Sequence, residues 1–398
     1  MTAGVGGSTA DRELAGLRPH GATPAPLGRE ACEARLDRAR ELMTELGADA
    51  MLVTAGASLR YFTGLPWGAT ERLVGVVVPR HGPPTMICPA FELGSLQAGL
   101  AIEAGVALWE EDESPFLLAA GLLDGAGVLA LDPGAPFSVF DGLRQAAPSL
   151  QIVSAARVID GCRMIKSDEE LARLQYAKTL TLQVQRAAAA MLAPGVSATA
   201  VRQFIDAAHR TLGADNGSYF CAVQFGAATA YPHGVPGEQI LAEGDLVLID
   251  TGCQIQGYHS DITRTYVFGE PTTEHRRIWD IEHEAQAAAF GAARPGVTCE
   301  SVDRAARVVL ERHGLGPGYR LPGLPHRTGH GIGLSIHEPA YLVAGDKTLL
   351  APGMCFSNEP MIVMPDAFGI RLEDHFYVTA DGAAWFTPPS DSIDAPFA

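Results

Sequence analysis

The sequence has few basic residues and no long apolar run. Lysine and arginine number 29 against 46 aspartates and glutamates, which gives a net charge of −17 at pH 7. Nucleic acids and anionic membrane surfaces bind basic patches, so we expect neither as a partner. No stretch reaches the ~18 uninterrupted apolar residues that a membrane helix needs, and no membrane span is expected.

Paired cysteines and a secretion signal are also missing. The seven cysteines are scattered singly, without a C-x-x-C pair, which favours reduced thiols and a cytoplasmic location over a disulfide framework. The first residues lack a basic segment followed by an apolar core, so no signal peptide is expected. Because residues 1–29 are rich in Gly, Ala and Pro, we predict a flexible N-terminal extension.

Residues 30–160 alternate between helical and strand-like patterns. The stretch "REACEARLDRARELMTELG" has helical spacing and ends at Gly47, and "AMLVT" and "GVLALD" are short apolar runs. Strands interleaved with helices predict an α/β domain. Its glycines do not have the spacing of a dinucleotide or phosphate loop, so this domain shows no chemistry of its own.

A second domain is predicted over residues 161–398. Near its start, Ser167 and Glu170 have the spacing of a capping box, and the helix that follows should stop at Pro194-Gly195. Beyond that helix, "APGVSATAVRQFIDAAHRTLG" aligns with "RPGVTCESVDRAARVVLERHG" at an offset of 295 − 194 = 101. Further along, "LAEGDLVLID" aligns with "LAPGMCFSNE" at an offset of 359 − 250 = 109. The repeat predicts two related halves, each with an acid at the same place.

Each half contains two acids in strand-like or alternating runs: Asp250, Asp261, Glu359 and Glu373. Converging carboxylates are costly unless positive charge lies between them. Arg264 and Arg371 are candidates to neutralise some of this charge, but a pair of divalent cations does so more readily. Hard or borderline ions bind such oxygen-rich sites with a histidine added.

The stretch "LPHRTGHGIGLSIHEP" supplies the histidines. His330 lies among glycines that indicate a close backbone approach or positive φ, and His326 and His337 flank it. His233 precedes the first acid pair as His337 precedes the second. Taken singly, each acid fits a turn or salt bridge, His233 a surface position, and the glycines a structural loop. Their order within a duplicated frame predicts a dinuclear metal site.

These motifs resemble the M24 metallopeptidase family of creatinase, prolidase and methionine aminopeptidase. The resemblance covers roughly 160–385 through the D-x10-D spacing, "SDITRT", "GHGIGLSIHE", "NEP" and "IRLED". The stretch "LRYFTGLPWGATERL" is similar to the creatinase-type domain of the Xaa-Pro peptidases, and the chain looks most like their compact bacterial dipeptidases. The resemblance implies an α/β creatinase-like domain followed by an α+β pita-bread catalytic domain with a pseudo-two-fold repeat.

The resemblance also implies roles for the site residues. Asp261 and Glu373 would bridge two divalent ions, Mn²⁺ first and Co²⁺ or Zn²⁺ as alternatives. The full ligand set would be Asp250, Asp261, His330, Glu359 and Glu373. Substrate-binding residues would be His233, His326 and His337. The catalytic residues would be Glu359, His337, His233 and Arg371, with Arg371 orienting the carboxylates.

The implied reaction is hydrolysis of the bond before proline in Xaa-Pro dipeptides, with a metal-bridged water as nucleophile and Glu359 as proton shuttle. The alternatives are an Xaa-Pro aminopeptidase, a metal-free hydrolase of the creatinase or ectoine type, and a non-catalytic binding protein. Val363 stands where most relatives have a tyrosine, which puts the usual arrangement of the reaction intermediate in doubt. By analogy we expect a small peptide substrate and a homodimer or dimer of dimers.

Overall fold

The structure, a computed structural model, describes residues 2–397 and divides into two units. The smaller unit is Ala25–Arg163, and the larger comprises the described residues up to Pro24 and from Met164 onward. The boundary expected between 160 and 161 therefore falls between 163 and 164. Within residues 2–397, none of the helices combines the length and the apolar character that crossing a membrane requires.

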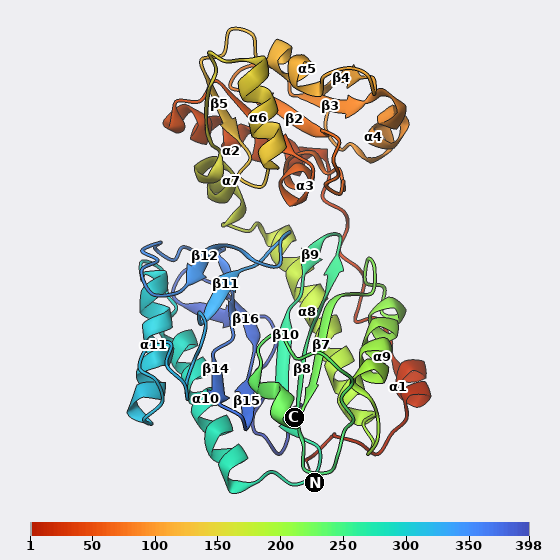
Figure 1. Cartoon of the computed structure of the whole chain (residues 1–398), viewed down its shortest axis with the longest axis vertical. Coiled ribbons are helices and arrows are strands. Elements are labelled where there is room, and N and C mark those ends of the chain that lie inside the picture. The colour runs from red at the N-terminus through yellow and green to blue at the C-terminus, as the bar shows by residue number, and fades with distance from the viewer. Residues whose placement is uncertain (1, 398) are drawn as a thin grey trace. The chain divides into compact units, whose positions relative to one another are not determined.

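The smaller unit is a mixed six-stranded sheet with strand order β4-β3-β2-β1-β5-β6, and helices interleave with its strands (Figure 1). Helix α2 (Arg29–Leu46) ends before Gly47, whose φ of 75° lies in the left-handed region that favours glycine. The strands are β1 (Ala50–Thr54), β2 (Gly75–Pro79), β3 (Thr85–Pro89), β4 (Gly105–Trp109), β5 (Val128–Leu131) and β6 (Gln151–Ser154). The helices are α2 (Arg29–Leu46), α3 (Ala57–Thr63), η1 (Ala90–Glu92), α4 (Leu93–Gly99), α5 (Pro115–Leu122), α6 (Phe137–Ala146) and α7 (Ala156–Arg163).

The prediction of a flexible extension is wrong for the first part of the chain. A helix, α1 (Ala10–Gly16), starts at Thr9, whose side chain accepts a bond from the Arg12 backbone. Before it, the backbone of Thr2 donates to Gly269 at 3.1 Å. Val5, Leu14 and Leu17 are among the apolar side chains that pack against the core of the larger unit. Composition alone missed these apolar anchors between the glycines.

The larger unit contains two antiparallel sheets and a separate hairpin. The first sheet has the order β10-β8-β7 with β9 beside β8, and the second has the order β12-β11-β13-β16-β17. Their strands are β7 (Ser218–Phe225), β8 (Leu246–Ile255), β9 (Tyr258–His259), β10 (Ile262–Val267), β11 (Gly329–Gly331), β12 (Glu338–Leu342), β13 (Cys355–Asn358), β16 (Asp374–Val378) and β17 (Ala383–Trp385). The hairpin is β14 (Met361–Met364) with β15 (Phe368–Arg371).

Each half of the larger unit has its own helices and hydrophobic core. Helices α8 (Asp168–Ala190) and α9 (Ala198–Thr211) pack on the first sheet, while α10 (Thr273–Ala292) and α11 (Cys299–Arg312) accompany the strands of the second half (Figure 1). A short 3-10 helix, η2 (Gly226–Ala230), follows β7. The capping box of Ser167 and Glu170 is present at the start of α8, as predicted.

The predicted repeat is confirmed by hydrogen bonds that recur at both alignment offsets. The Gly195 backbone donates to Leu241 at 2.8 Å, and the Gly296 backbone donates to Leu350 at 2.9 Å. These pairs differ by 296 − 195 = 101 and 350 − 241 = 109, the offsets read from the sequence. Duplicated segments therefore fold into equivalent local structures.

The two halves meet along the strands that carry the acids. The backbone of Glu373 donates to the carbonyl of Thr263 at 3.0 Å, which forms an isolated antiparallel bridge between the halves. Beside it, the Thr265 hydroxyl donates to the carbonyl of Arg371 at 2.7 Å. This seam brings the ends of β10, β15 and β16 together, and the candidate site lies along it.

Candidate metal centre

Short backbone segments from both halves deliver the predicted ligands. Asp250 lies within β8, and Asp261 lies immediately before β10. His330 is the middle residue of β11. Glu359 directly follows β13, and Glu373 lies between β15 and β16. Asp250 is therefore presented from within a strand, and the other three acids lie directly beside strand ends.

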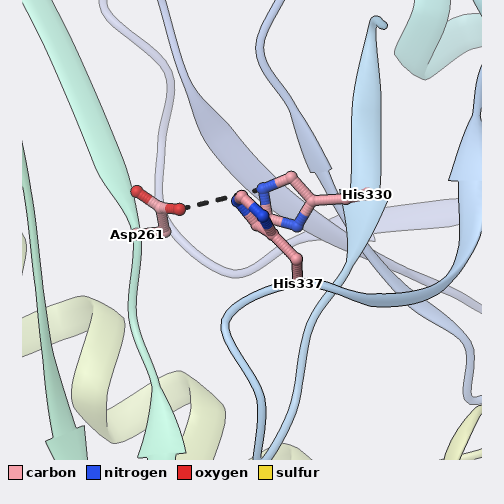
Figure 2. Close-up of side chains that lie close together, drawn as sticks. All are labelled: Asp261, His330 and His337. Carbon is pink, nitrogen blue, oxygen red and sulfur yellow. Dashed lines mark ion pairs between the residues drawn. The ribbon is translucent and has the colours of Figure 1, made fainter. Parts of the chain in front are cut away.

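Four of these residues converge closely. The Nε2 atom of His330 lies 3.1 Å from Glu359 Oε1 and 3.8 Å from Asp261 Oδ2. Figure 2 shows Asp261 facing His330 and His337 from the opposite strand. Donor atoms within 4.8 Å of one another occur in the group of His330, Glu359 and Glu373 and in the group of Asp261, His330 and His337. Such groups have the spacing that one coordinated ion can bridge.

Asp250 is held at the edge of this cluster by Arg371. The Arg371 guanidinium donates to Asp250 Oδ2 through Nη2 and to the Thr263 hydroxyl through Nε at 3.0 Å. The Thr263 hydroxyl in turn donates to Glu373 Oε2 at 2.8 Å. Arg371 thus orients Asp250 directly and Glu373 through Thr263, although Asp250 is in none of the close donor groups of the described chain.

His330 is fixed so that one ring nitrogen faces the acids. Its Nδ1 lies 3.0 Å from the carbonyl of Gly331, and its backbone N–H donates to the Ser357 hydroxyl at 2.9 Å. The carbonyl at Nδ1 fixes the ring so that Nε2 is the nitrogen that can bind a metal.

Several atoms that face the cluster have no hydrogen-bond partner among the described residues. They are Asp250 Oδ1, Asp261 Oδ1, His330 Nε2 and Glu373 Oε1. Leaving one buried polar group unsatisfied costs ~1–3 kcal/mol, and more when the group is charged. Divalent cations would satisfy all four atoms, and one imidazole with several carboxylates is a donor set that such ions accept. The residues therefore fit the metals that the sequence predicts.

The electrostatics of the cluster are those of several carboxylates buried together. Burial, reinforced by the neighbouring carboxylates, raises the pKa values of Asp261 and Glu373 well above their ordinary range. Burial pushes the pKa of Glu359 in the same direction, but His330, with His326 and Arg371, outweighs it and lowers that pKa. Glu359 therefore stays ionised, while the two predicted bridging acids need a cation to ionise fully.

The other predicted histidines surround this cluster. The ring of His337 lies 4.1 Å from the ring of His330 between centroids. Burial, with smaller contributions from His330, Arg327 and His233, lowers the pKa of His337 to about 4. His326 is close enough to Glu359 for the two to interact electrostatically, and its Nε2 has no hydrogen-bond partner in the described chain. The structure thus places His337 against His330, His326 near Glu359 and His233 near His337.

The glycines around His330 permit a close backbone approach, one of the two expected reasons for them. A Cβ atom on Gly329 would lie 2.1 Å from the Ser357 carbonyl oxygen, and one on Gly331 would lie 2.5 Å from the Glu338 carbonyl oxygen. Neither residue has a positive φ. Only glycine lets β11 lie between its neighbours and present His330.

Comparison with known proteins identifies the family. Residues 172–380 match the description "Metallopeptidase family M24", and residues 35–165 match "Creatinase/Prolidase N-terminal domain". The chain belongs to metallopeptidase family M24. The M24 chain consists of a creatinase-type N-terminal domain and a pita-bread catalytic domain, as predicted. Membership implies divalent metal ions.

Relatives of this M24 chain carry dipeptidase and prolidase names. The probable dipeptidase PepE of Mycobacterium tuberculosis is 37% identical over 358 residues, covering 88% of this chain and 92% of the relative. The crystal structure of dipeptidase PepE from Mycobacterium ulcerans superposes with a TM-score of 0.82, 34% identity and coverage of 91% and 97%. A prolidase from Thermococcus sibiricus superposes with a TM-score of 0.81, 29% identity and coverage of 89% and 96%. The M24 chain is thus a peptidase of dipeptidase or prolidase type.

The side chain of Val363 is buried in the structure. It lies in β14, is 4% exposed and belongs to the hydrophobic core of the second half. Its backbone exchanges hydrogen bonds with Gly323 at 3.0 and 3.2 Å. The side chain that replaces the usual tyrosine is an apolar core residue and offers the reaction no hydroxyl.

Two glutamines that the sequence prediction missed hold the acid-bearing strands in equivalent ways. The side-chain amide of Gln185 on α8 donates to the carbonyls of Ile249 and Ile262, at 3.0 and 2.9 Å. The amide of Gln286 on α10 donates to the carbonyls of Asn358 and Leu372, at 3.3 and 3.2 Å. All four carbonyls belong to residues next to predicted ligands. The glutamines differ by 286 − 185 = 101, so the repeat offset was a signal that could have found them.

Proposed function

We propose that the chain is a dinuclear metal-dependent dipeptidase that cleaves the bond before proline in Xaa-Pro dipeptides. The observation that supports this most is the convergence of Asp261, His330, Glu359 and Glu373. Asp261, His330 and Glu373 each have a buried polar atom without a hydrogen-bond partner among the described residues. Relatives named dipeptidase and prolidase, which match nearly the whole chain, support the substrate class.

The metals would be held by Asp250, Asp261, His330, Glu359 and Glu373, with Mn²⁺ proposed first and Co²⁺ or Zn²⁺ as alternatives. Two divalent ions in such a site make a bound water acidic near neutral pH and polarise the scissile carbonyl. The chain's own residues supply orientation and proton transfer.

Glu359 is proposed as the proton shuttle. Its lowered pKa keeps it ionised, so it is ready to accept a proton from the attacking water. The Ser357 hydroxyl donates to Glu359 Oε1 at 3.1 Å, which orients the carboxylate. Glu359 would then pass the proton to the proline nitrogen as it leaves.

The histidines are proposed to bind substrate and stabilise charge. The lowered pKa of His337 leaves its imidazole neutral, able to donate one hydrogen bond to the oxyanion that forms. His233 and His326 would contact the flanking carbonyl or carboxylate. Because proline lacks an amide hydrogen, recognition of this residue must come from shape and apolar contact. We also propose a cytoplasmic homodimer.

The test is hydrolysis of an Xaa-Pro dipeptide and an Xaa-Pro-Xaa tripeptide by chelator-stripped protein, with and without Mn²⁺. Mn²⁺-dependent cleavage of the dipeptide alone is the expected result. Cleavage of the tripeptide would move the assignment to an Xaa-Pro aminopeptidase. Metal-independent hydrolysis would favour a creatinase-type mechanism, and metal binding without activity on either peptide would overturn the proposed substrate.

A further inference from the structure

A histidine outside the predicted ligand set faces the same cluster. His375 lies on β16 two residues after Glu373, so both side chains project from the same face of the chain. His375 is 0% exposed, and its backbone pairs with Ser357 of β13, the strand that Glu359 directly follows. Two potential ligands therefore lie close together here, Glu373 just before β16 and His375 within it.

The ring nitrogens of His375 lack good partners. Neither makes a well-formed hydrogen bond among the described residues, although the ring lies near the backbone of Asp261. The Nε2 atom lies 4.0 Å from Glu373 Oε1, which also lacks a partner. At this distance Nε2 and the carboxylate oxygen are too far apart to hydrogen-bond, and a cation between them would satisfy both atoms.

The donor atoms of Asp261, Glu373 and His375 lie within 4.8 Å of one another, and all three residues are buried. A different group, formed by His330, Glu359 and Glu373, has the same spacing. The two groups share only Glu373, which was predicted to bridge two ions. The geometry points to His375 as a metal ligand that gives the second ion an imidazole of its own, while His330 serves the first.

The surrounding charges keep His375 able to bind a cation. A buried ammonium, that of Lys178, lies in the neighbourhood of the ring and is held by other groups. Lys178 is itself buried, donates to the carbonyl of His259 at 3.1 Å and lies 4.8 Å from the ring centre of Phe386. The carboxylates of Asp261 and Glu373 offset the charge of an added ion.

This inference rests on the proposed dinuclear centre. It is tested by calorimetric titration of Co²⁺ into chelator-stripped full-length protein, with His375→Phe replacing the ring by one without nitrogen. We expect two binding events in the wild type and one of them weakened about 100-fold in the variant, as for loss of an interaction that tunes the metal. The visible spectrum of the bound Co²⁺ should change at the same time.

The matched control is His209→Phe. His209 is also a fully buried histidine of the larger unit, but both its ring nitrogens have partners, Thr181 at 3.0 Å and Ser218 at 2.9 Å. This variant should lose stability in thermal unfolding of the stripped protein and keep both Co²⁺ affinities. It thereby separates the loss of a buried histidine from the loss of a ligand.

Unchanged affinities for two ions in His375→Phe would overturn the inference and leave the proposed function standing. Wild-type protein that binds no Co²⁺ would overturn both. If His375→Phe does not fold, X-ray absorption of the Co²⁺-loaded His337→Ala protein decides the question by counting imidazole ligands. Two imidazoles shared by two ions agree with ligation by both His330 and His375, and one imidazole contradicts it.

Discussion

The two halves of the catalytic unit use the same frame for different tasks. In the first half, Arg264 is fully buried and pairs with Asp374 of the second half, Nη2 to Oδ1 at 2.7 Å. In the second half, Arg371 crosses in the opposite direction to Asp250 of the first. Asp374 is outside the predicted ligand set, whereas Asp250 is within it. Arg264 also donates to the backbone carbonyl of Glu373 at 2.9 Å. One crossing therefore joins the halves through backbone and a non-ligand acid, and the other orients the carboxylate of a predicted ligand.

The predicted ligands also differ between the halves. The first half uses aspartates from β8 and from the start of β10, where the backbone is close to the seam. The second half uses glutamates from the ends of strands, and each glutamate reaches one methylene further. The second half alone adds His330 between close-packed glycines. Duplication thus supplied the acids, and divergence in one copy supplied the imidazole.

Breaking the shared acid cluster should have the largest effect. In Asp261→Asn, metal affinity and peptide hydrolysis should fall by about 1,000-fold or more, since the metals supply several kcal/mol of transition-state stabilisation. The stripped variant should nevertheless melt a few °C above stripped wild type, because the cost of either ionising or protonating this buried carboxyl is gone. Calorimetric titration, peptide hydrolysis and thermal unfolding measure these effects. A stripped variant that melts well below wild type would contradict the account.

Replacing Arg264 or Arg371 by leucine should separate the stabilisation of the contact between the halves from the orientation of a predicted ligand. Arg264→Leu leaves the buried Asp374 unpaired and should lower the free energy of unfolding by about 3–5 kcal/mol. Its folded fraction should keep metal affinity within a few fold. Arg371→Leu should lower metal affinity by about 10–100-fold, as loss of a group that orients ligands does. Denaturant unfolding and metal titration of both variants measure the contrast, and equal effects on affinity would refute it.

The paired glutamines should give smaller and similar effects. Gln185→Leu and Gln286→Leu each remove hydrogen bonds to two backbone carbonyls, so each should cost about 1–3 kcal/mol of stability. Because both glutamines hold residues beside ligands, each variant should also weaken metal binding. Denaturant unfolding and calorimetry measure both effects. A loss confined to one variant would show that the repeat is not equivalent at this position.

The smallest expected effect concerns pH. The folded-state pKa values of Asp261 and Glu373 are raised, so their contribution to stability is full below the unfolded pKa near ~4 and is lost as the pH rises through the raised values. Stripped Asp261→Asn should therefore gain over stripped wild type progressively as the pH rises from acid toward neutral. Thermal unfolding across this range measures the gain, and a gain independent of pH would contradict the assignment.

Much of this site could be predicted from sequence because duplication leaves a regular trace. The offset of the repeats aligned Asp250 with Glu359, and the structure reproduces that offset in its backbone hydrogen bonds. His375 lies outside the aligned segments. Its position beside the cluster follows only from the pairing of β16 with β13 in the structure. The packing of residues 2–17 depends on a few scattered apolar side chains, which composition does not reveal.

The central claim is that the two halves close one dinuclear site for Xaa-Pro hydrolysis. The most direct test is to measure bound Mn²⁺ and dipeptide hydrolysis together while Mn²⁺ is added to stripped protein. The account predicts no activity without metal and a rate that saturates when two ions are bound per chain. Full activity in the stripped protein, or saturation of binding without hydrolysis, would contradict it.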